Sequence, residues 1–135
     1  MWKLLVLALF AAACTKAEPA QERHAPAQLQ TMTVDEVDAS LAKGEVQPVD
    51  VNGDATRQHE GVLPGAVLLT DDDSFKISEL PADKSKPLVF YCANTACSSS
   101  HHAAEKAITA GYERVRVMPD GIAGWIKAGK QTQKI

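Results

Sequence analysis

Short apolar runs alternate along this chain with stretches in which apolar residues recur at helical spacing. The apolar runs predict strands at 47–51, 67–69, 88–91 and 115–118. The helical stretches are 33–43, a short segment within 52–60, 75–80, the segment after Cys97, and 122–128. Strands that alternate with helices are typical of an α/β fold with a mainly parallel sheet.

Two of these helices carry clear local signals. Thr33 and Glu36 stand at the spacing of a capping box, in which each side chain accepts from the other residue's backbone N–H, so the first helix is expected to begin there. The helix after Cys97 is predicted to lie close to the sheet, because its apolar face is rich in small residues. That face consists of Ala103, Ala104, Ala107 and Ile108.

The candidate chemistry follows the strand at 88–91. Cys92 stands at the carboxyl end of that strand, where the loops of an α/β sheet form a crevice. Backbone N–H groups and a helix N-terminus favour a thiolate, which is the reactive form of cysteine, and they would equally hold a persulfide. The alternative interpretation is a buried, inert cysteine that closes a core strand.

Three further residues belong to this candidate site. Cys97 lies five positions after Cys92, and a disulfide between them requires the loop to curl so that the Cα atoms approach within about 7 Å. If the helix already includes Cys97, His101 lies one turn further on the same side, and Cys92, Cys97 and His101 become an alternative metal site. Asp50, at the end of an earlier strand, is either a polar residue of the crevice or is satisfied by nearby backbone N–H groups.

The first 13 residues have the layout of a secretory signal peptide, with one basic residue, a short apolar run and small residues before Cys14. The run is half the length needed to span a bilayer. Ala11, Ala12, Ala13 and Cys14 resemble the lipobox of bacterial lipoproteins. The resemblance implies a lipid on Cys14 and attachment to the periplasmic side of a bacterial membrane; the alternative is a soluble secreted or periplasmic protein.

Residues 14–30 contain little to bury and are predicted to be the lipidated N-terminus and a flexible tether. Residues 31–135 are long enough for one modest core and form the predicted folded domain. The formal net charge of −3, with scattered lysines, argues against a nucleic acid partner, which needs a clustered basic face.

Several stretches taken together resemble a single rhodanese-like domain over residues 31–130. They are Val49-Asp50-Val51, Leu63-Pro64-Gly65-Ala66, Val89-Phe90-Tyr91-Cys92, Gly111-Tyr112, Gly121 and Trp125. The resemblance implies a three-layer sandwich around a five-stranded, mainly parallel sheet. It also implies a sulfurtransferase without a cofactor, in which Cys92 takes sulfane sulfur from a small donor as a persulfide and passes it to a thiol acceptor.

The sequence departs from that family in the loop after Cys92. The loop residues expected to bind the sulfur anion are Ala93, Asn94, Thr95, Ala96, Cys97 and Ser98. Cys97 stands where active members often have arginine, the loop is about two residues longer than usual, and Asn52 replaces a frequent arginine. A loop without a cation is expected to hold a dianion such as thiosulfate poorly.

Three functional hypotheses therefore remain open at this level. The first is sulfur transfer in the cell envelope through a Cys92 persulfide. The second is a thiol–disulfide redox protein that uses Cys92 and Cys97. The third is a noncatalytic module that binds a metal or a partner. The sequence identifies neither the sulfur donor and acceptor, nor the oligomeric state, nor whether the two cysteines are joined.

Overall fold

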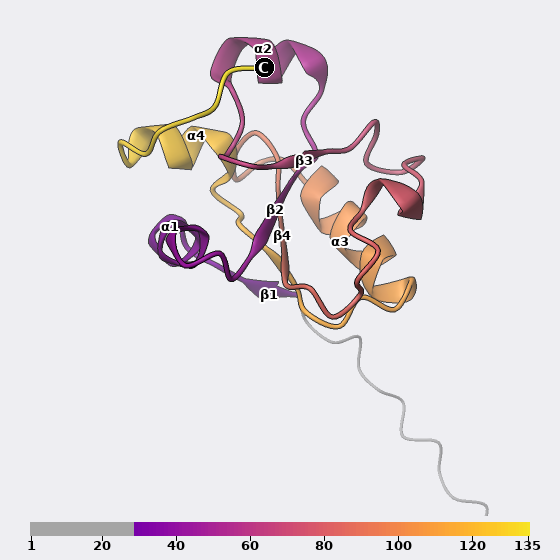
Figure 1. Cartoon of the computed structure of the whole chain (residues 1–135). Coiled ribbons are helices and arrows are strands. Elements are labelled where there is room, and N and C mark those ends of the chain that lie inside the picture. Colours follow the sequence, from indigo (N-terminus) through magenta and orange to yellow (C-terminus); the bar gives the residue numbers. More distant parts are fainter. Residues whose placement is uncertain (1–28) are drawn as a thin grey trace, which may run out of the picture.

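The computed structural model describes residues 29–135, which form a three-layer α/β sandwich (Figure 1). Its strands are β1 (Gln30–Thr31), β2 (Gln47–Asp50), β3 (Val67–Leu68), β4 (Leu88–Tyr91) and β5 (Val115–Val117). Its helices are α1 (Val34–Ala42), α2 (Asp54–Glu60), the 3₁₀ helix η1 (Ile77–Glu79), α3 (Ser99–Thr109) and α4 (Gly121–Lys127). The predicted fold class is confirmed.

The sheet has five strands in the order β1-β5-β4-β2-β3, and every pair of neighbouring strands is parallel. The middle strand is therefore β4, with neighbours on both sides. All four of its residues are fully buried, which explains why the strand is an uninterrupted apolar run. Residues that follow β4 consequently leave from the centre of the sheet's carboxyl edge.

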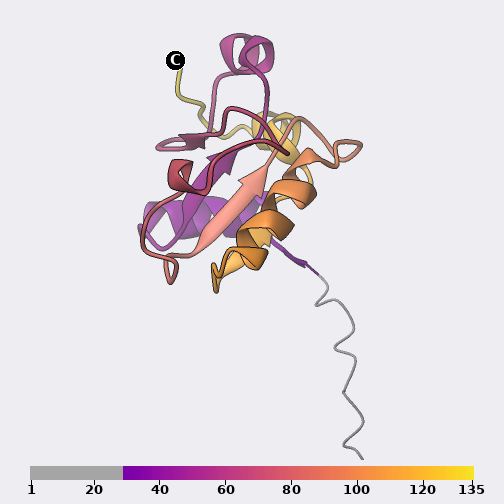
Figure 2. The ribbon, with the colours of Figure 1, turned by 90° about the vertical axis from the view of Figure 1, so that its right-hand side faces the viewer.

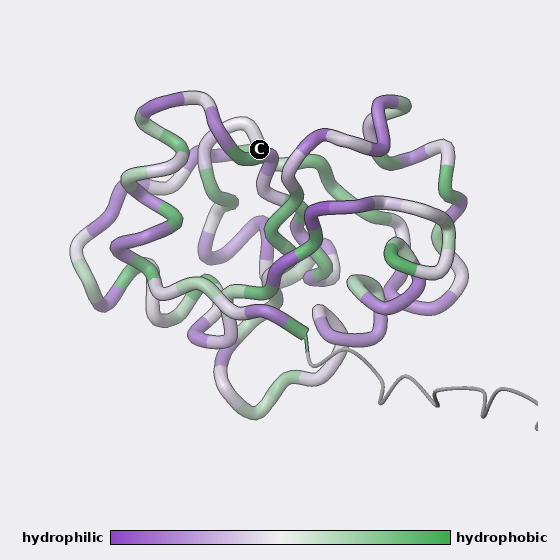
Figure 3. Tube along the Cα trace, turned by 90° about the horizontal axis from the view of Figure 1, so that it is seen from below, coloured by the Kyte–Doolittle hydropathy of each residue, from purple (hydrophilic) through white to green (hydrophobic). Residues whose placement is uncertain are grey.

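Helices cover both faces of the sheet. Figure 1 shows α1 and α4 on one face and α3 on the other, and α3 lies along the sheet in Figure 2. Two hydrophobic clusters fill the spaces between the layers: one contains Phe90, Cys92 and the alanines of α3, and the other contains Tyr91, Ile122 and Trp125. Figure 3 shows the alternation of hydrophobic and hydrophilic stretches along the chain that builds these layers.

One residue of the predicted α3 face is placed differently. Ala103, Ala104 and Ala107 are completely buried, as expected, but Ile108 is 43% exposed. The buried stripe also contains Ser100. At 3.6 residues per turn, Ile108 lies about 90° from the centre of a stripe formed by residues 100, 103, 104 and 107. The prediction that Ile108 is buried was therefore wrong.

The element boundaries follow the sequence closely. The capping box of α1 is confirmed, because Glu36 N donates to Thr33 Oγ1 (3.2 Å) and Thr33 N donates to Glu36 Oε2 (2.8 Å). The predicted strands are present, three of them one residue shorter than expected. Strand β1 was not predicted, since two residues are too short to show a period, and it contains Gln30, the last residue of the predicted tether.

The N-terminal predictions lie outside the described residues. The signal peptide, Cys14 and its lipid, and the tether up to residue 28 all fall before residue 29. Within residues 29–135, no helix combines the length and the apolar character needed to cross a membrane.

Glu79, the last residue of η1, is expected to make the stability of the fold depend on pH through its hydrogen bonds to the segment between β3 and η1. The Glu79 carboxylate accepts from Lys76 N (2.8 Å) and Thr70 N (2.9 Å), and these hydrogen bonds lower its pKa. A carboxyl pKa that is lower in the folded state gives stability that is present above its unfolded value near 4.3 and is lost as the pH falls through the folded value. Glu79→Gln should therefore flatten the acid side of the stability profile.

Urea unfolding between pH 7 and pH 3 measures this effect. Glu113→Gln is the matched control, because Glu113 is exposed and its side chain has no hydrogen bond within the described residues. Equal acid sensitivity in the wild type and Glu79→Gln would contradict the assignment.

Candidate active site

Cys92 occupies the position that the sequence predicts, directly after β4 at the centre of the sheet. Its side chain is 2% exposed and belongs to the cluster on the α3 face. Its sulfur is bonded to that of Cys97, and the two Cα atoms are 6.4 Å apart. The question that the sequence left open is thus answered for this structure: the loop curls, and the two cysteines form a disulfide.

Asn94 gives the loop its curl. The Asn94 side-chain Oδ1 accepts from Ala96 N (3.0 Å), and its carbonyl accepts from Cys97 N (3.1 Å). Asparagine stabilises turns by bonding the backbone two residues ahead in this way. These two bonds fold Cys97 back towards Cys92, so the disulfide joins residues that the loop's own hydrogen bonds have already brought together.

Helix α4 fixes the start of the loop. Ile122 N donates to the Cys92 carbonyl and Ala123 N donates to the Ala93 carbonyl, both at 2.9 Å. Gly121 begins the helix with a φ of +63°, and a Cβ there would lie 2.6 Å from the Cys92 carbonyl oxygen. Because the helix approaches the loop this closely, only glycine fits at position 121.

The loop also presents backbone donors. Among the residues described, no protein acceptor binds the N–H groups of Ala93, Asn94 or Thr95. Asn94, Thr95, Ala96 and Ser98 are exposed, so a small solute can reach the loop. No lysine or arginine occurs between Cys92 and Glu105, so the loop itself offers an anion only N–H groups, and the cation that shares the adjoining groove with Asn94 and Thr95 is Lys127 of α4.

Asp50 is held inside the fold through one carboxylate oxygen, Oδ1, while its Oδ2 is buried without a hydrogen-bond partner among the described residues. It is completely buried, and its Oδ1 accepts from Asn52 N (2.7 Å) and Arg57 Nε (3.0 Å). Arg57 also donates to the carbonyls of Asp50 (3.1 Å) and Leu69 (2.7 Å). Arg57 thereby ties the carboxyl ends of β2 and β3 together beneath the loops.

Tyr91 lies beside this ion pair. Its hydroxyl oxygen accepts from Leu63 N at 3.0 Å. Burial raises the pKa of the Tyr91 hydroxyl, and the negative charge of Asp50 raises it further, so the phenol stays protonated. Tyr91 therefore stabilises the chain next to the site and does not act as a base.

The geometry assumed for the alternative metal site is not present. The first residue of α3 is Ser99, so Cys97 lies before the helix and not one turn from His101 on it. Both cysteine sulfurs are bonded to each other. His101 nevertheless has a buried Nδ1 without a hydrogen-bond partner among the described residues. A metal at Cys92, Cys97 and His101 remains a prediction for the reduced chain.

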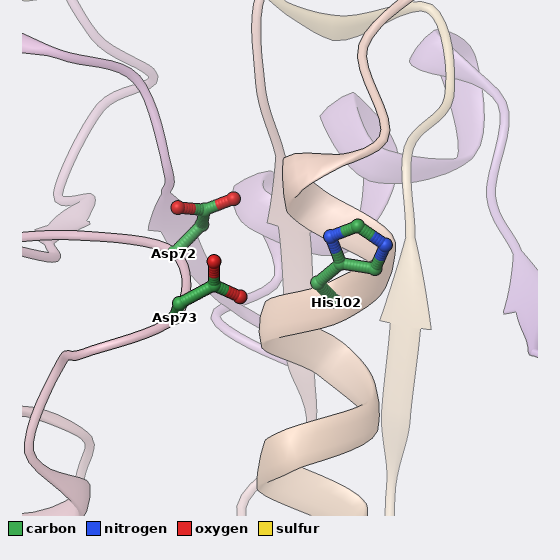
Figure 4. A group of neighbouring side chains, drawn as sticks. All are labelled: Asp72, Asp73 and His102. Atoms are coloured by element: carbon green, nitrogen blue, oxygen red, sulfur yellow. The ribbon is translucent and has the colours of Figure 1, made fainter.

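The structure brings a different group of potential ligands together. Asp72, Asp73 and His102 place one ligand atom each within 4.8 Å of one another, across the gap between the β3–η1 segment and α3 (Figure 4). The aspartates belong to the turn predicted for residues 71–73, in which Asp71 Oδ1 accepts from Asp73 N and Ser74 N. Asp73 and His102 are exposed, and exposed acidic groups of this kind are common in proteins without a bound metal.

A groove of about 630 Å³ borders the loop on the side of α4. Two loop residues, Asn94 and Thr95, form part of its wall. The remaining lining residues are Thr33, Val34, Asp35, Asp120, Ala123, Gly124, Lys127 and Ala128. Cys92 is not among its lining residues, and its side chain packs on the opposite face of the sheet, against α3.

Two residues that shape this site were not singled out as such from the sequence. Arg57 belongs to a short polar helix, and the only signal for its burial is an opposite charge seven positions earlier, on Asp50. Gly121 was one of the positions on which the family resemblance rests. Its structural role depends on the approach of α4 to the loop, which a single sequence does not reveal.

Comparison with known proteins identifies the family. No curated protein matches the sequence significantly. Among solved structures, the fold is similar to a rhodanese-like domain protein from Staphylococcus aureus (24% identity, TM-score 0.62, covering 78% of this chain and 99% of that one). It is also similar to part of the thiosulfate sulfurtransferase from Pseudomonas aeruginosa (22% identity, TM-score 0.64, covering 78% and 20%). The rhodanese-like domain family matches residues 33–128, and the chain therefore belongs to this family.

Proposed function

We propose that the reduced chain is a sulfurtransferase that carries sulfane sulfur as a persulfide on Cys92. The observation that carries this proposal is the position of Cys92 at the carboxyl end of the central strand, at the start of a loop whose N–H groups at 93–95 have no acceptor within residues 29–135. Membership of the rhodanese-like family and the sulfurtransferases among its structural neighbours support it.

The chemistry requires Cys92 as a nucleophile. The thiolate attacks the outer sulfur of a donor, the bond between that sulfur and the donor's leaving group breaks, and Cys92 keeps the sulfur as a persulfide. The N–H groups of Ala93, Asn94 and Thr95 stabilise the negative charge before and after this step. Since the loop lacks a cation, donors with one negative charge should react better than the thiosulfate dianion.

We place this activity in the cell envelope. The proposed anchor is a lipid on Cys14, and the proposed partners are a small sulfur donor and a thiol acceptor. Support for the location comes from the N-terminal sequence, in which an apolar run and small residues precede Cys14.

A thiol–disulfide redox function is the second candidate, and the disulfide between Cys92 and Cys97 favours it. In that case the pair exchanges electrons with a substrate dithiol and no sulfur atom is carried. The disulfide also affects the first candidate, because Cys92 has no thiolate until the bond is reduced.

Donor cleavage tests the proposal directly. The full chain with Cys14→Ser is reduced, freed of reductant and mixed with thiosulfate or with benzenethiosulfonate, which carries a single charge. We expect about one sulfite or benzenesulfinate per chain, formed faster with benzenethiosulfonate, and the mass of one sulfur added at Cys92 when Cys97→Ser is used.

Cys92→Ser is expected to abolish this cleavage. Cys97→Ser is the matched control, because it removes a thiol from the same loop and should still form sulfite or sulfinate. Cleavage that persists in Cys92→Ser, or a wild type that forms neither product, would refute sulfur transfer and leave the redox candidate.

A further inference from the structure

We infer that Cys97 discharges the Cys92 persulfide within the loop, so that the chain reduces sulfane sulfur to hydrosulfide and ends each turnover as the Cys92–Cys97 disulfide. This inference rests on the proposed function, and it makes the first acceptor a residue of the chain itself. Its basis is the direct bond between the two sulfurs in a loop whose hydrogen bonds hold it curled.

The geometry favours attack from within the loop. The Cα atoms of Cys92 and Cys97 are 6.4 Å apart, and the two Asn94 hydrogen bonds hold the intervening backbone in a turn. Cys92 is 2% exposed, whereas Cys97 is half-buried and packs against the same hydrophobic cluster. An external thiol must reach a buried sulfur, but Cys97 already lies against it.

The reaction balances without an external oxidant. The Cys97 thiolate attacks the inner sulfur of the Cys92 persulfide, a bond forms between the two cysteine sulfurs, and the bond to the outer sulfur breaks. The outer sulfur takes the electron pair and, with the proton of the Cys97 thiol, leaves as hydrosulfide. The two electrons that reduce it come from Cys92 and Cys97, which become the disulfide.

The cation-free loop is consistent with this outcome. A lysine or arginine within the loop would hold the outer sulfur as a stable anion, but none occurs between Cys92 and Glu105, and the lysine that shares the adjoining groove, Lys127, belongs to α4. The loop residues Asn94, Thr95, Ala96 and Ser98 are exposed, so hydrosulfide released from the loop has a short path into solvent.

The next turnover requires a dithiol reductant. Because Cys97 is the more exposed of the two residues, the reductant's thiolate attacks the Cys97 sulfur, and Cys92 leaves as the thiolate. The second thiol of the reductant then releases Cys97 and completes the reductant's own disulfide. This order regenerates the nucleophile that the first step needs.

A single-turnover experiment tests the inference. Reduced full chain with Cys14→Ser, which contains only the two loop thiols, is mixed with one equivalent of benzenethiosulfonate in the absence of any added thiol. Benzenethiosulfonate is chosen because its leaving group is a sulfinate, which cannot form a mixed disulfide with the chain. Benzenesulfinate, hydrosulfide and the masses of the loop peptides are then followed together.

We expect about one hydrosulfide per chain from the wild-type loop, together with a cross-linked Cys92–Cys97 peptide. In Cys97→Ser and in Cys97→Ala, sulfinate should form but the added sulfur should remain on Cys92. Hydrosulfide release should slow on the order of a hundredfold in both variants, because an attached thiol acts at a high effective concentration.

Two other results would overturn the inference, and they are distinguishable. If sulfinate forms and the wild-type persulfide lasts as long as that of Cys97→Ser, sulfur transfer stands and the internal discharge is wrong. If no sulfinate forms in any of the chains, the proposed function itself fails, and the inference fails with it.

Discussion

Replacing Arg57 with alanine is expected to lower the free energy of unfolding by about 3–5 kcal/mol, because it leaves the Asp50 carboxylate buried without its charged partner. The Arg57 side chain is 6% exposed, and Asp50 is completely buried. The substitution also removes the hydrogen bonds that Arg57 donates to the carbonyl groups of Asp50 and Leu69, and losing a buried donor adds to the loss of stability.

Urea unfolding at pH 7 measures this loss. Arg114→Ala is the control, since Arg114 is exposed and forms no ion pair within residues 29–135, and it should change the free energy by no more than about 0.5 kcal/mol. The double variant Asp50→Ala, Arg57→Ala should lose less than the sum of the single losses, because the two residues interact. A loss below about 1 kcal/mol for Arg57→Ala would show that the pair is not what holds β2 and β3 together.

Substituting Gly121 with alanine is expected to cost about 3 kcal/mol or more and to slow donor cleavage. The φ of +63° is unfavourable for alanine, and the added Cβ would lie within 2.8 Å of three backbone atoms of Cys92 and Ala93. Backbone atoms cannot move aside as the end of a flexible side chain can. The start of the loop must shift, and the N–H groups that follow Cys92 shift with it.

Gly129→Ala separates the cost of the positive φ from the cost of the contact between α4 and the loop. Gly129 has a φ of +76°, but nothing lies within 4 Å of a Cβ built there. Its substitution should cost only the conformational penalty of about 1–2 kcal/mol and should leave donor cleavage unchanged. Similar losses for the two variants, in stability and in sulfinate formation, would contradict the role assigned to the contact between α4 and the loop.

The fold could be predicted wherever local chemistry determines it. The apolar run of β4 and the capping box of Thr33 and Glu36 are signals contained in a few neighbouring residues, and the structure contains both elements. Strand β1 has only two residues, so its pairing with β5 depends on tertiary contacts that no short pattern encodes. Ile108 shows the same limit, because the width of a buried helix face is set by what packs against it.

In the candidate site, too, the features set by neighbouring residues could be predicted, and those set by long-range contacts could not. The position of Cys92 follows from the strand that precedes it, and the sequence also indicated its second thiol, Cys97. Whether the two sulfurs meet depends on the turn at Asn94. The same residues could also form an extended loop, so the sequence alone does not predict the turn. The burial of Arg57 beneath the loops is a long-range feature, since its partners lie on β2 and just beyond β3.

The hydrogen bonds from α4 to the carbonyl groups of Cys92 and Ala93 divide the loop into an anchored part and a free part. Residues 94–98 are held mainly by the turn at Asn94 and by the disulfide itself. When the disulfide opens, the hydrogen bonds from α4 still hold the backbone of Cys92, and the turn at Asn94 still holds Cys97 near it. We therefore expect the oxidised and reduced forms to differ only within residues 94–98, which form an exposed segment that a reductant reaches first.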